Sequence, residues 1–161
     1  MTFFDYPGTE DSPANGPAAD VFLPDASDRD WAVLLRHCRR RRFDRGQTLI
    51  EAGATTRSLY IVVDGFLEVL APVPGRREGR YKRIVTVGAG SVLGEMSFFD
   101  SAGRSAMVRA VTPVEVDELS PADFDALADE DPLLGRQILF DLGRVLAQRL
   151  RKAQSPAWSS D

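Results

Sequence analysis

One stretch organises the rest of this chain, and it reads Gly94-Glu95-Met96-Ser97-Phe98-Phe99-Asp100-Ser101-Ala102-Gly103-Arg104-Ser105-Ala106. A glycine and a carboxylate open a short apolar turn, and a small polar loop follows. Arg104 and Ser105 then lead into a strand-like run. Gly94 permits a sharp turn or a close approach of the backbone to another group.

The residue types in this stretch fit a particular ligand chemistry. We expect a short helix over Met96–Phe99, whose first backbone N–H groups suit an anion. Arg104 is able to grip a phosphate through two parallel hydrogen bonds. Glu95 repels a phosphate, so it would accept hydrogen bonds from hydroxyl groups instead. Together these groups predict a site for a sugar phosphate.

The same stretch resembles the phosphate-binding cassette of cyclic nucleotide-binding domains, the module of bacterial catabolite activators, of the regulatory subunit of cAMP-dependent protein kinase and of cyclic-nucleotide-gated channels. The matching pattern is Gly-Glu, a small residue two positions later, and Arg-Ser-Ala after a short loop. The likeness extends from about Phe43 to about Arg151. An Arg–Glu surface pair beside a turn is the plainer interpretation, and five spaced identities favour the cassette over it.

The resemblance also implies roles for the residues. Arg104 would bind the cyclic phosphate, Ser105 would help through its hydroxyl or amide, and Glu95 would hold the ribose 2′-hydroxyl. The implied ligand-binding residues are Gly94, Glu95, Met96, Ser97, Arg104, Ser105 and Ala106. No catalytic residue and no metal ligand is expected.

Composition limits the class of protein. The chain has 161 residues, of which 43% are hydrophobic and 27% charged, and this suits one soluble domain with a core. Its single cysteine, Cys38, rules out an intrachain disulfide. Neither a signal peptide nor a membrane-spanning run is apparent. We therefore expect a cytoplasmic protein without a membrane segment.

The chain divides into three parts. Residues 1–26 are rich in Pro, Gly, Ala and Asp and predict a flexible acidic tail. The triplet Val21-Phe22-Leu23 is apolar enough to dock on the body or on a partner, but we expect a loosely held terminus. Residues 27–154 form the predicted cyclic nucleotide-binding domain, and residues 155–161 a frayed end.

The middle of the chain predicts a β-structure. From Phe43 the apolar residues follow a period of two, and short strands alternate with glycine-containing corners. The dipeptide Asp64-Gly65 predicts a hairpin between strands at 59–63 and 66–70. Further strands are expected at 84–87, 107–111 and 114–119. This pattern and the resemblance predict a mainly β fold, an eight-stranded antiparallel jelly roll or β-roll with flanking helices.

Helices are predicted on both sides of the roll. Ser27 and Asp30 form a capping box that starts an N-terminal helix. The four arginines Arg39–Arg42 are interpreted as the solvated end of that helix, where cations complement its dipole, and not as a nucleic-acid patch.

After the roll, cap-proline pairs at Ser120-Pro121 and Asp131-Pro132 start two more helices, which the resemblance identifies as hinge and lid helices. The apolar stripe of the last helix is Leu134, Ile138, Leu142, Val145, Leu146 and Leu150. In the family this helix closes over the base or pairs with its copy in a dimer. Arg149, Lys152 and Gln154 are candidates to reach the base by position only, and solvent exposure is the alternative for each.

The sequence lacks the motifs of several other kinds of binding site and enzyme. The sequence contains neither a phosphate-binding loop of the Gly-x-x-x-x-Gly-Lys type nor a strand-linked Gly-x-Gly-x-x-Gly. With one histidine, His37, and one cysteine, a metal site would need several carboxylates. The helix-turn-helix that follows the long helix in catabolite activators is also not expected, so we expect no DNA-binding domain.

The leading hypothesis is a non-enzymatic cyclic nucleotide-binding sensor. Its ligand would be cAMP or cGMP, with cAMP slightly favoured, and it would need no cofactor. It would signal through its C-terminal helices to an unidentified effector protein, and a homodimer through the last helix is a further option. The alternatives are a nucleotide-free β-roll that serves as a protein-interaction module, and, more remotely, a metal-dependent roll enzyme.

Overall fold

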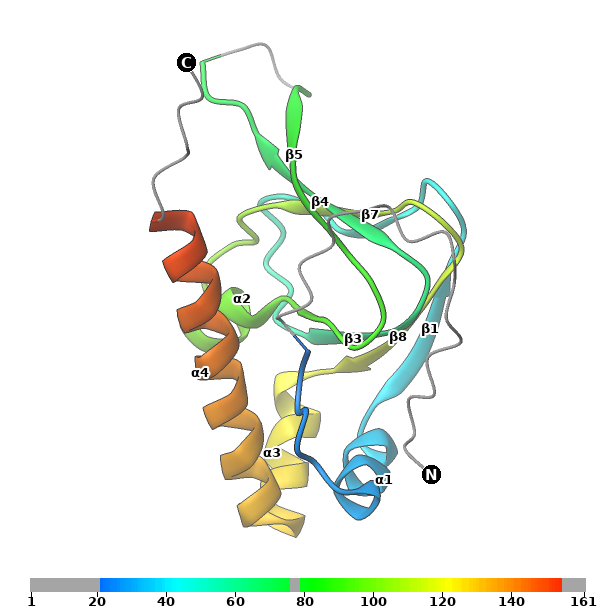
Figure 1. Cartoon of the computed structure of the whole chain (residues 1–161), viewed down its shortest axis with the longest axis vertical. Helices are drawn as coiled ribbons and strands as arrows, with labels where there is room; N and C mark the ends of the chain where they lie inside the picture. The colour runs from blue at the N-terminus through cyan, green and yellow to red at the C-terminus, as the bar shows by residue number, and fades with distance from the viewer. Residues whose placement is uncertain (1–20, 76–78, 155–161) are drawn as a thin grey trace.

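The computed structural model describes residues 21–75 and 79–154. Two four-stranded sheets face each other, and helices cover one end and one side of them (Figure 1). In chain order the elements are α1 (Asp28–Arg36), β1 (Arg39–Phe43), β2 (Thr48–Ile50), β3 (Leu59–Asp64), β4 (Leu67–Pro72), β5 (Tyr81–Val87), β6 (Val92–Leu93), α2 (Glu95–Asp100), β7 (Met107–Ala110), β8 (Val114–Leu119), α3 (Pro121–Glu130) and α4 (Pro132–Gln154). The predicted eight-stranded antiparallel roll with flanking helices is confirmed.

The sheets have the strand orders β1-β8-β3-β6 and β2-β7-β4-β5, and every pairing is antiparallel. Strand β3 is buried on both faces, which explains its nearly continuous apolar sequence. Tyr60 and Val62 face the roll interior, whereas Leu59 and Ile61 belong to the cluster beneath the helices. The first sheet therefore separates two cores, one inside the roll and one that anchors α1, α3 and α4.

The predicted hairpin at Asp64-Gly65 is wrong. Strands β3 and β4 lie in different sheets, and β4 pairs with β5 and β7 instead. Gly65 has a φ of +85°, and a Cβ there would lie 2.1 Å from the carbonyl oxygen of Pro113. The turn is thus a corner at which the chain passes from one sheet to the other. It is fixed by contact with residues 112–114, which the local sequence does not reveal.

The interpretation of Arg39–Arg42 as a helix end is also wrong. Helix α1 ends at Arg36, and the arginines form the edge strand β1, paired with β8. Arg40 donates from Nε to Asp117 at 2.6 Å, and Arg41 donates to Glu118 at 3.2 Å. The acidic residues of the neighbouring strand therefore balance the run of cations.

The predicted helix starts are confirmed. Ser27 and Asp30 form the capping box of α1, and the Ser120 side chain accepts a hydrogen bond from the Asp123 N–H at the start of α3. In the apolar stripe of α4, Leu134, Ile138, Leu142 and Val145 are buried. Leu150, in contrast, is 59% exposed and lies outside that buried face.

Part of the predicted tail belongs to the body. Phe22 and Leu23 are 2% and 3% exposed and lie in the core cluster beneath the helices. Residues 1–20 and 155–161, to which the predictions of a flexible tail and a frayed end otherwise apply, lie outside the described residues. Within 21–75 and 79–154, no helix combines the length and the apolar character needed to cross a bilayer.

Candidate functional site

A cavity of about 570 Å³ lies between the roll, α2 and the last turns of α4. This volume is within the range of about 300–1,000 Å³ that is usual for small-molecule sites. One part of its wall is apolar and comprises Ile50, Val69, Ile84, Val85, Val87, Leu93, Val108 and Ala153. The remainder comes from residues 94–106 and from α4, and it contains the polar and charged side chains of the lining.

Gly94 is the point at which β6 turns into α2. It has a φ of +88°, a left-handed conformation that is costly for residues with a side chain. A Cβ at this position would lie 2.6 Å from the Ser58 carbonyl oxygen and 2.7 Å from Nη1 of Arg104. Glycine is therefore required both by the turn and by the close approach of Arg104.

Arg104 is only 5% exposed, and the backbone around the site holds its guanidinium in place. Nε donates to Oγ1 of Thr56 at 3.3 Å, Nη1 to the Gly94 carbonyl at 2.9 Å and Nη2 to the Ser58 carbonyl at 2.7 Å. These bonds use three of the five N–H groups and leave one on each terminal nitrogen. Two remaining donors on one side chain are what a bidentate grip on phosphate needs.

The charge of Arg104 is not neutralised by an ion pair with any described residue, since its three acceptors are uncharged oxygens. Burial is the main cause that lowers the pKa of Arg104, and Tyr60, Glu95 and Glu118 oppose it electrostatically. A buried cation without a counterion is costly, and an anion in the cavity would remove that cost.

Glu95 is the acidic counterpart in the same cavity and is 6% exposed. Its Oε1 accepts a hydrogen bond from Nη1 of Arg149 on α4 at 2.6 Å. Nη2 of Arg149 donates to the carbonyl of Val92 at 2.7 Å. The long helix thus meets the site directly, through a side chain that binds both the carboxylate and the strand before it.

The structure brings all the predicted site residues to this one cavity. Its lining includes Gly94, Glu95, Met96, Ser97, Arg104, Ser105 and Ala106. Of the candidates on α4, Arg149 and Lys152 line the cavity, whereas Gln154 is exposed and is not part of the lining. Among the described residues, no cluster of three or more His, Cys, Asp or Glu suits a metal ion.

Sequence reasoning missed the segment Gly53–Ser58, which lies beside the cassette. The Gly53 N–H donates to the Arg104 carbonyl at 2.7 Å, and the Arg104 N–H donates to the Ala54 carbonyl at 2.8 Å. Arg57 donates to the carbonyls of Ser97 and Phe98 at 3.3 and 3.1 Å, near the end of α2. This segment therefore holds both Arg104 and α2, and no motif in it signals that role.

Comparison with known proteins identifies a family and several relatives. Residues 40–131 match the family model described as the cyclic nucleotide-binding domain. The cAMP-activated global transcriptional regulator Vfr of Pseudomonas aeruginosa is 37% identical over 123 residues, which cover 74% of this chain and 54% of that protein. The chain thus spans about half the length of this curated relative.

Solved structures show the same likeness. The catabolite activator protein of Thermus thermophilus superposes with a TM-score of 0.72 at 27% identity, covering 81% of this chain and 58% of that one. A cyclic nucleotide-binding domain from Methylobacillus flagellatus gives a TM-score of 0.73 at 28% identity, covering 80% and 71%.

Proposed function

The chain belongs to the cyclic nucleotide-binding domain family, and we propose that it is a non-enzymatic sensor that binds a 3′,5′-cyclic nucleotide in the cavity beside α2 and α4. The single observation that carries this proposal is the buried guanidinium of Arg104, which lines the cavity without a counterion among the described residues. A cyclic phosphate is a monoanion, so it would supply the negative charge that Arg104 lacks as a counterion.

The polar groups of the cavity divide between phosphate and sugar. Arg104 would donate its two remaining N–H groups to the phosphate oxygens, supported by Ser105. Glu95 has one carboxylate oxygen bound by Arg149, and the other would accept the ribose 2′-hydroxyl. The backbone and small side chains of Gly94, Met96, Ser97 and Ala106 would complete the contacts, and the apolar wall would pack against the base.

We assign cAMP ahead of cGMP as the ligand. The relative from Pseudomonas aeruginosa is described as cAMP-activated, and the Arg104-Ser105 pair resembles the cassette of the bacterial activators. Because that relative is about twice as long as the matched region, its activity as a transcriptional regulator is not assigned to this chain.

The signal would leave through α4. A ligand shifts a conformational equilibrium only if it contacts the two states differently, and α4 supplies cavity residues that provide such a difference.

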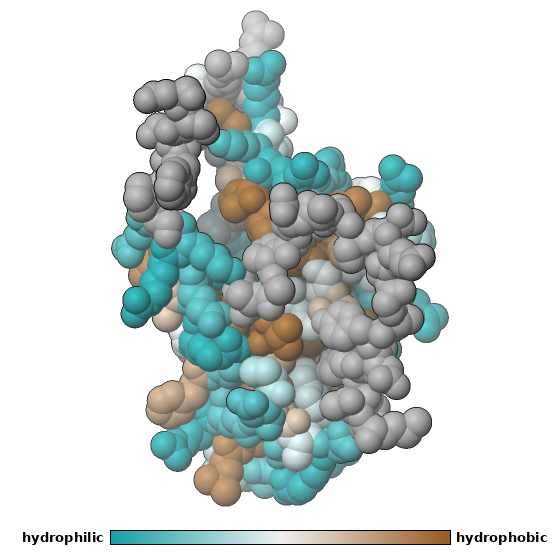
Figure 2. All heavy atoms as spheres, in the orientation of Figure 1, coloured by the Kyte–Doolittle hydropathy of each residue, from teal (hydrophilic) through white to brown (hydrophobic). Residues whose placement is uncertain are grey.

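Several apolar side chains of α4 are exposed, namely Leu133, Leu139, Phe140 and Leu150. On the face shown in Figure 2, hydrophobic atoms gather at the lower end of this helix among hydrophilic ones. An effector protein or a second copy of the chain would bind these side chains.

Isothermal titration calorimetry tests the proposal. Wild-type protein should bind cAMP, and cGMP more weakly, while 5′-AMP, with an open and doubly charged phosphate, should bind poorly. Arg104→Ala should weaken cAMP binding at least about 100-fold, because a buried charge-assisted bidentate contact is lost. Arg109→Ala is the matched control, since this arginine pairs with Glu68 on the roll and does not line the cavity.

The opposite result is equally clear. If the folded wild-type protein gives no heat with either cyclic nucleotide, and none is found by mass spectrometry in protein purified from cells, the nucleotide-free interaction module replaces the sensor.

A further inference from the structure

The segment Val21–Leu23, called the strap below, lies beside α4 (Figure 1). The Phe22 N–H donates to the Gly90 carbonyl at 2.9 Å, and Val21 forms a bridge with Ser91. The Phe22 side chain is 2% exposed and packs edge-on against Trp31, with 6.5 Å between ring centroids. The strap is therefore attached to the residues directly before β6.

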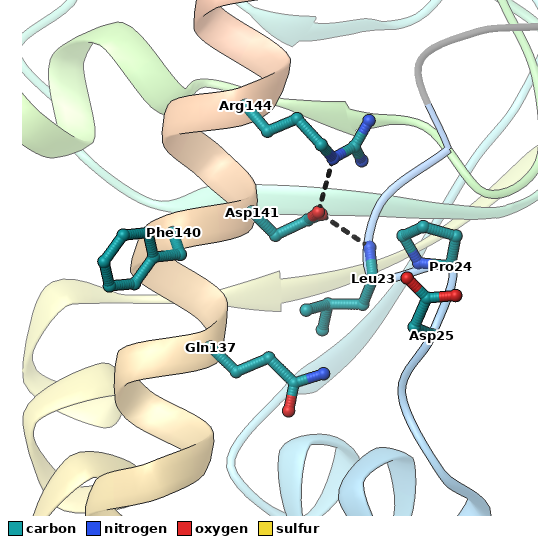
Figure 3. A pocket seen from close by; sticks show the side chains of 7 residues that line it. All are labelled: Leu23, Pro24, Asp25, Gln137, Phe140, Asp141 and Arg144. Atoms are coloured by element: carbon teal, nitrogen blue, oxygen red, sulfur yellow. Dashed lines mark hydrogen bonds and ion pairs between the residues drawn. The ribbon is translucent and has the colours of Figure 1, made fainter.

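Two residues of α4, Asp141 and Arg144, bind the other side of the strap. Figure 3 shows the contacts of Asp141 with Leu23 and with Arg144. Oδ2 of Asp141 accepts a hydrogen bond from the Leu23 N–H at 2.7 Å. Nε of Arg144 donates to Oδ1 of Asp141 at 2.7 Å, and Nη2 of Arg144 donates to the Val21 carbonyl at 2.7 Å. The Asp141 side chain is only 11% exposed, so its two charge-assisted bonds are partly shielded from water, whereas the bond from Arg144 to Val21 is exposed.

The backbone of the strap is fixed by these partners. Leu23 has a φ of +51°, a left-handed conformation that costs a residue with a side chain about 1–2 kcal/mol. Its side chain is 3% exposed, and its N–H is bound by Asp141. Burial and this hydrogen bond offset the backbone cost, so the strap is held on α4 in a conformation that it would not adopt alone.

Helix α4 is thus joined to residues 90–95 at two places along its length. Arg149 binds Glu95 and Val92 directly. Arg144, about 7.5 Å earlier along the helix axis, reaches the same region through the strap. The two attachments and the helix between them form a closed chain of contacts, and two of its members, Glu95 and Arg149, line the cavity.

We infer that Asp141 and Arg144 are positioning residues of the nucleotide site, which hold α4 where Arg149 meets Glu95. This inference rests on the proposed function. Without the strap attachment, α4 moves away from the cavity more often and the ligand escapes faster. Its association rate changes little, because the phosphate site is formed by residues outside α4.

The dissociation of radiolabelled cAMP, chased with unlabelled cAMP, measures this effect. Arg144→Gln should raise the dissociation rate about tenfold, since it removes charge-assisted hydrogen bonds to Val21 and Asp141. Asp141→Asn should act in the same direction. Arg136→Gln is the matched control, with the same change on the same helix at a residue that stacks on Phe140. Circular dichroism and thermal unfolding verify that each variant is folded.

A second comparison separates positioning from general destabilisation. If Arg144 acts by placing Arg149, then Arg144→Gln should change the cAMP dissociation constant little in an Arg149→Gln background. A purely structural role would leave its effect undiminished there, and this outcome overturns the inference. Unchanged dissociation in the single variant, with a wild-type protein that binds cAMP, overturns it as well. Absence of cAMP and cGMP binding by wild type instead overturns the proposed function.

Discussion

Nη1 of Arg104 donates a 2.9 Å hydrogen bond to the carbonyl of Gly94, and this bond joins the two ends of the cassette. The side chain that would meet the phosphate is therefore held by the residue that opens α2. Because the bond lies entirely within the chain, it restricts the rotation of the Arg104 side chain on its own. Preorganisation of this kind raises affinity by lowering the entropic cost of association.

Gly94→Ala should damage both the fold of the cassette and its binding. The new Cβ would strike the Ser58 carbonyl and Arg104, and the backbone would keep an unfavourable positive φ. Gly46→Ala is a matched control, because Gly46 also has a positive φ, of +84°, but has nothing within 4 Å of the added atom. Urea unfolding should show a loss of about 1 kcal/mol for the control and of at least about 2 kcal/mol for Gly94→Ala. Equal losses would contradict the steric argument.

A ligand without the 2′-hydroxyl tests the role proposed for Glu95. Wild-type protein should bind cAMP about tenfold more tightly than 2′-deoxy-cAMP, because a hydrogen bond to a charged group contributes about 1.5–3 kcal/mol. Glu95→Ala should bind the two nucleotides about equally. Calorimetry with both ligands measures this difference, and a variant that still prefers cAMP to the same extent would show that another group holds the hydroxyl.

Arg57 should affect the phosphate site although it does not line the cavity. It donates to two carbonyls near the end of α2, while neighbouring residues hold Arg104. Arg57→Gln should loosen α2 relative to Arg104 and weaken cAMP binding by about three- to tenfold. Arg45→Gln, an exposed residue elsewhere on the roll, should leave affinity unchanged. A similar affinity in both variants would remove Arg57 from the positioning of the site.

The predictions that succeeded from sequence depend on local chemistry. A capping box closes within three residues, so Ser27 and Asp30 reveal the start of α1 without knowledge of the rest of the chain. Residues 94–106 are similarly compact, and all of the predicted site residues line one cavity. Their roles in binding a nucleotide remain predictions.

The failures depend on partners far away in the chain. Arg104 is held by Thr56 and Ser58, which precede it by 48 and 46 positions. The corner at Gly65 is set by residues 112–114. The sequence does contain a sign that Arg39–Arg42 form a strand, because the acidic residues of β8 complement them across the sheet. It becomes visible only when the pairing of the two strands is known.

Cys38 should be unreactive in the folded protein. Burial is the main cause that raises the pKa of its thiol to about 12, with Asp117 and Asp123 contributing. At pH 8 only about one molecule in ten thousand would then carry the reactive thiolate. Labelling with a thiol-specific disulfide reagent should be slow in buffer and rapid in urea. Rapid labelling of the native protein would show that the thiol is accessible.

The contact between α1 and the end of α3 should make stability depend on pH. Hydrogen bonds lower the pKa of Glu130. The bond from His37 has the largest effect and the bond from Arg36 the next largest. Folding therefore favours the deprotonated carboxylate, so the contribution of Glu130 to stability is present above its unfolded pKa of about 4.3 and is lost as the pH falls through the lower, folded pKa. Urea unfolding between pH 7 and pH 3 should show a smaller acid-induced loss in Glu130→Gln than in wild type, whereas Asp129→Asn, the same change one residue earlier, should follow wild type. Parallel curves for Glu130→Gln and wild type would show that this contact does not contribute to acid sensitivity.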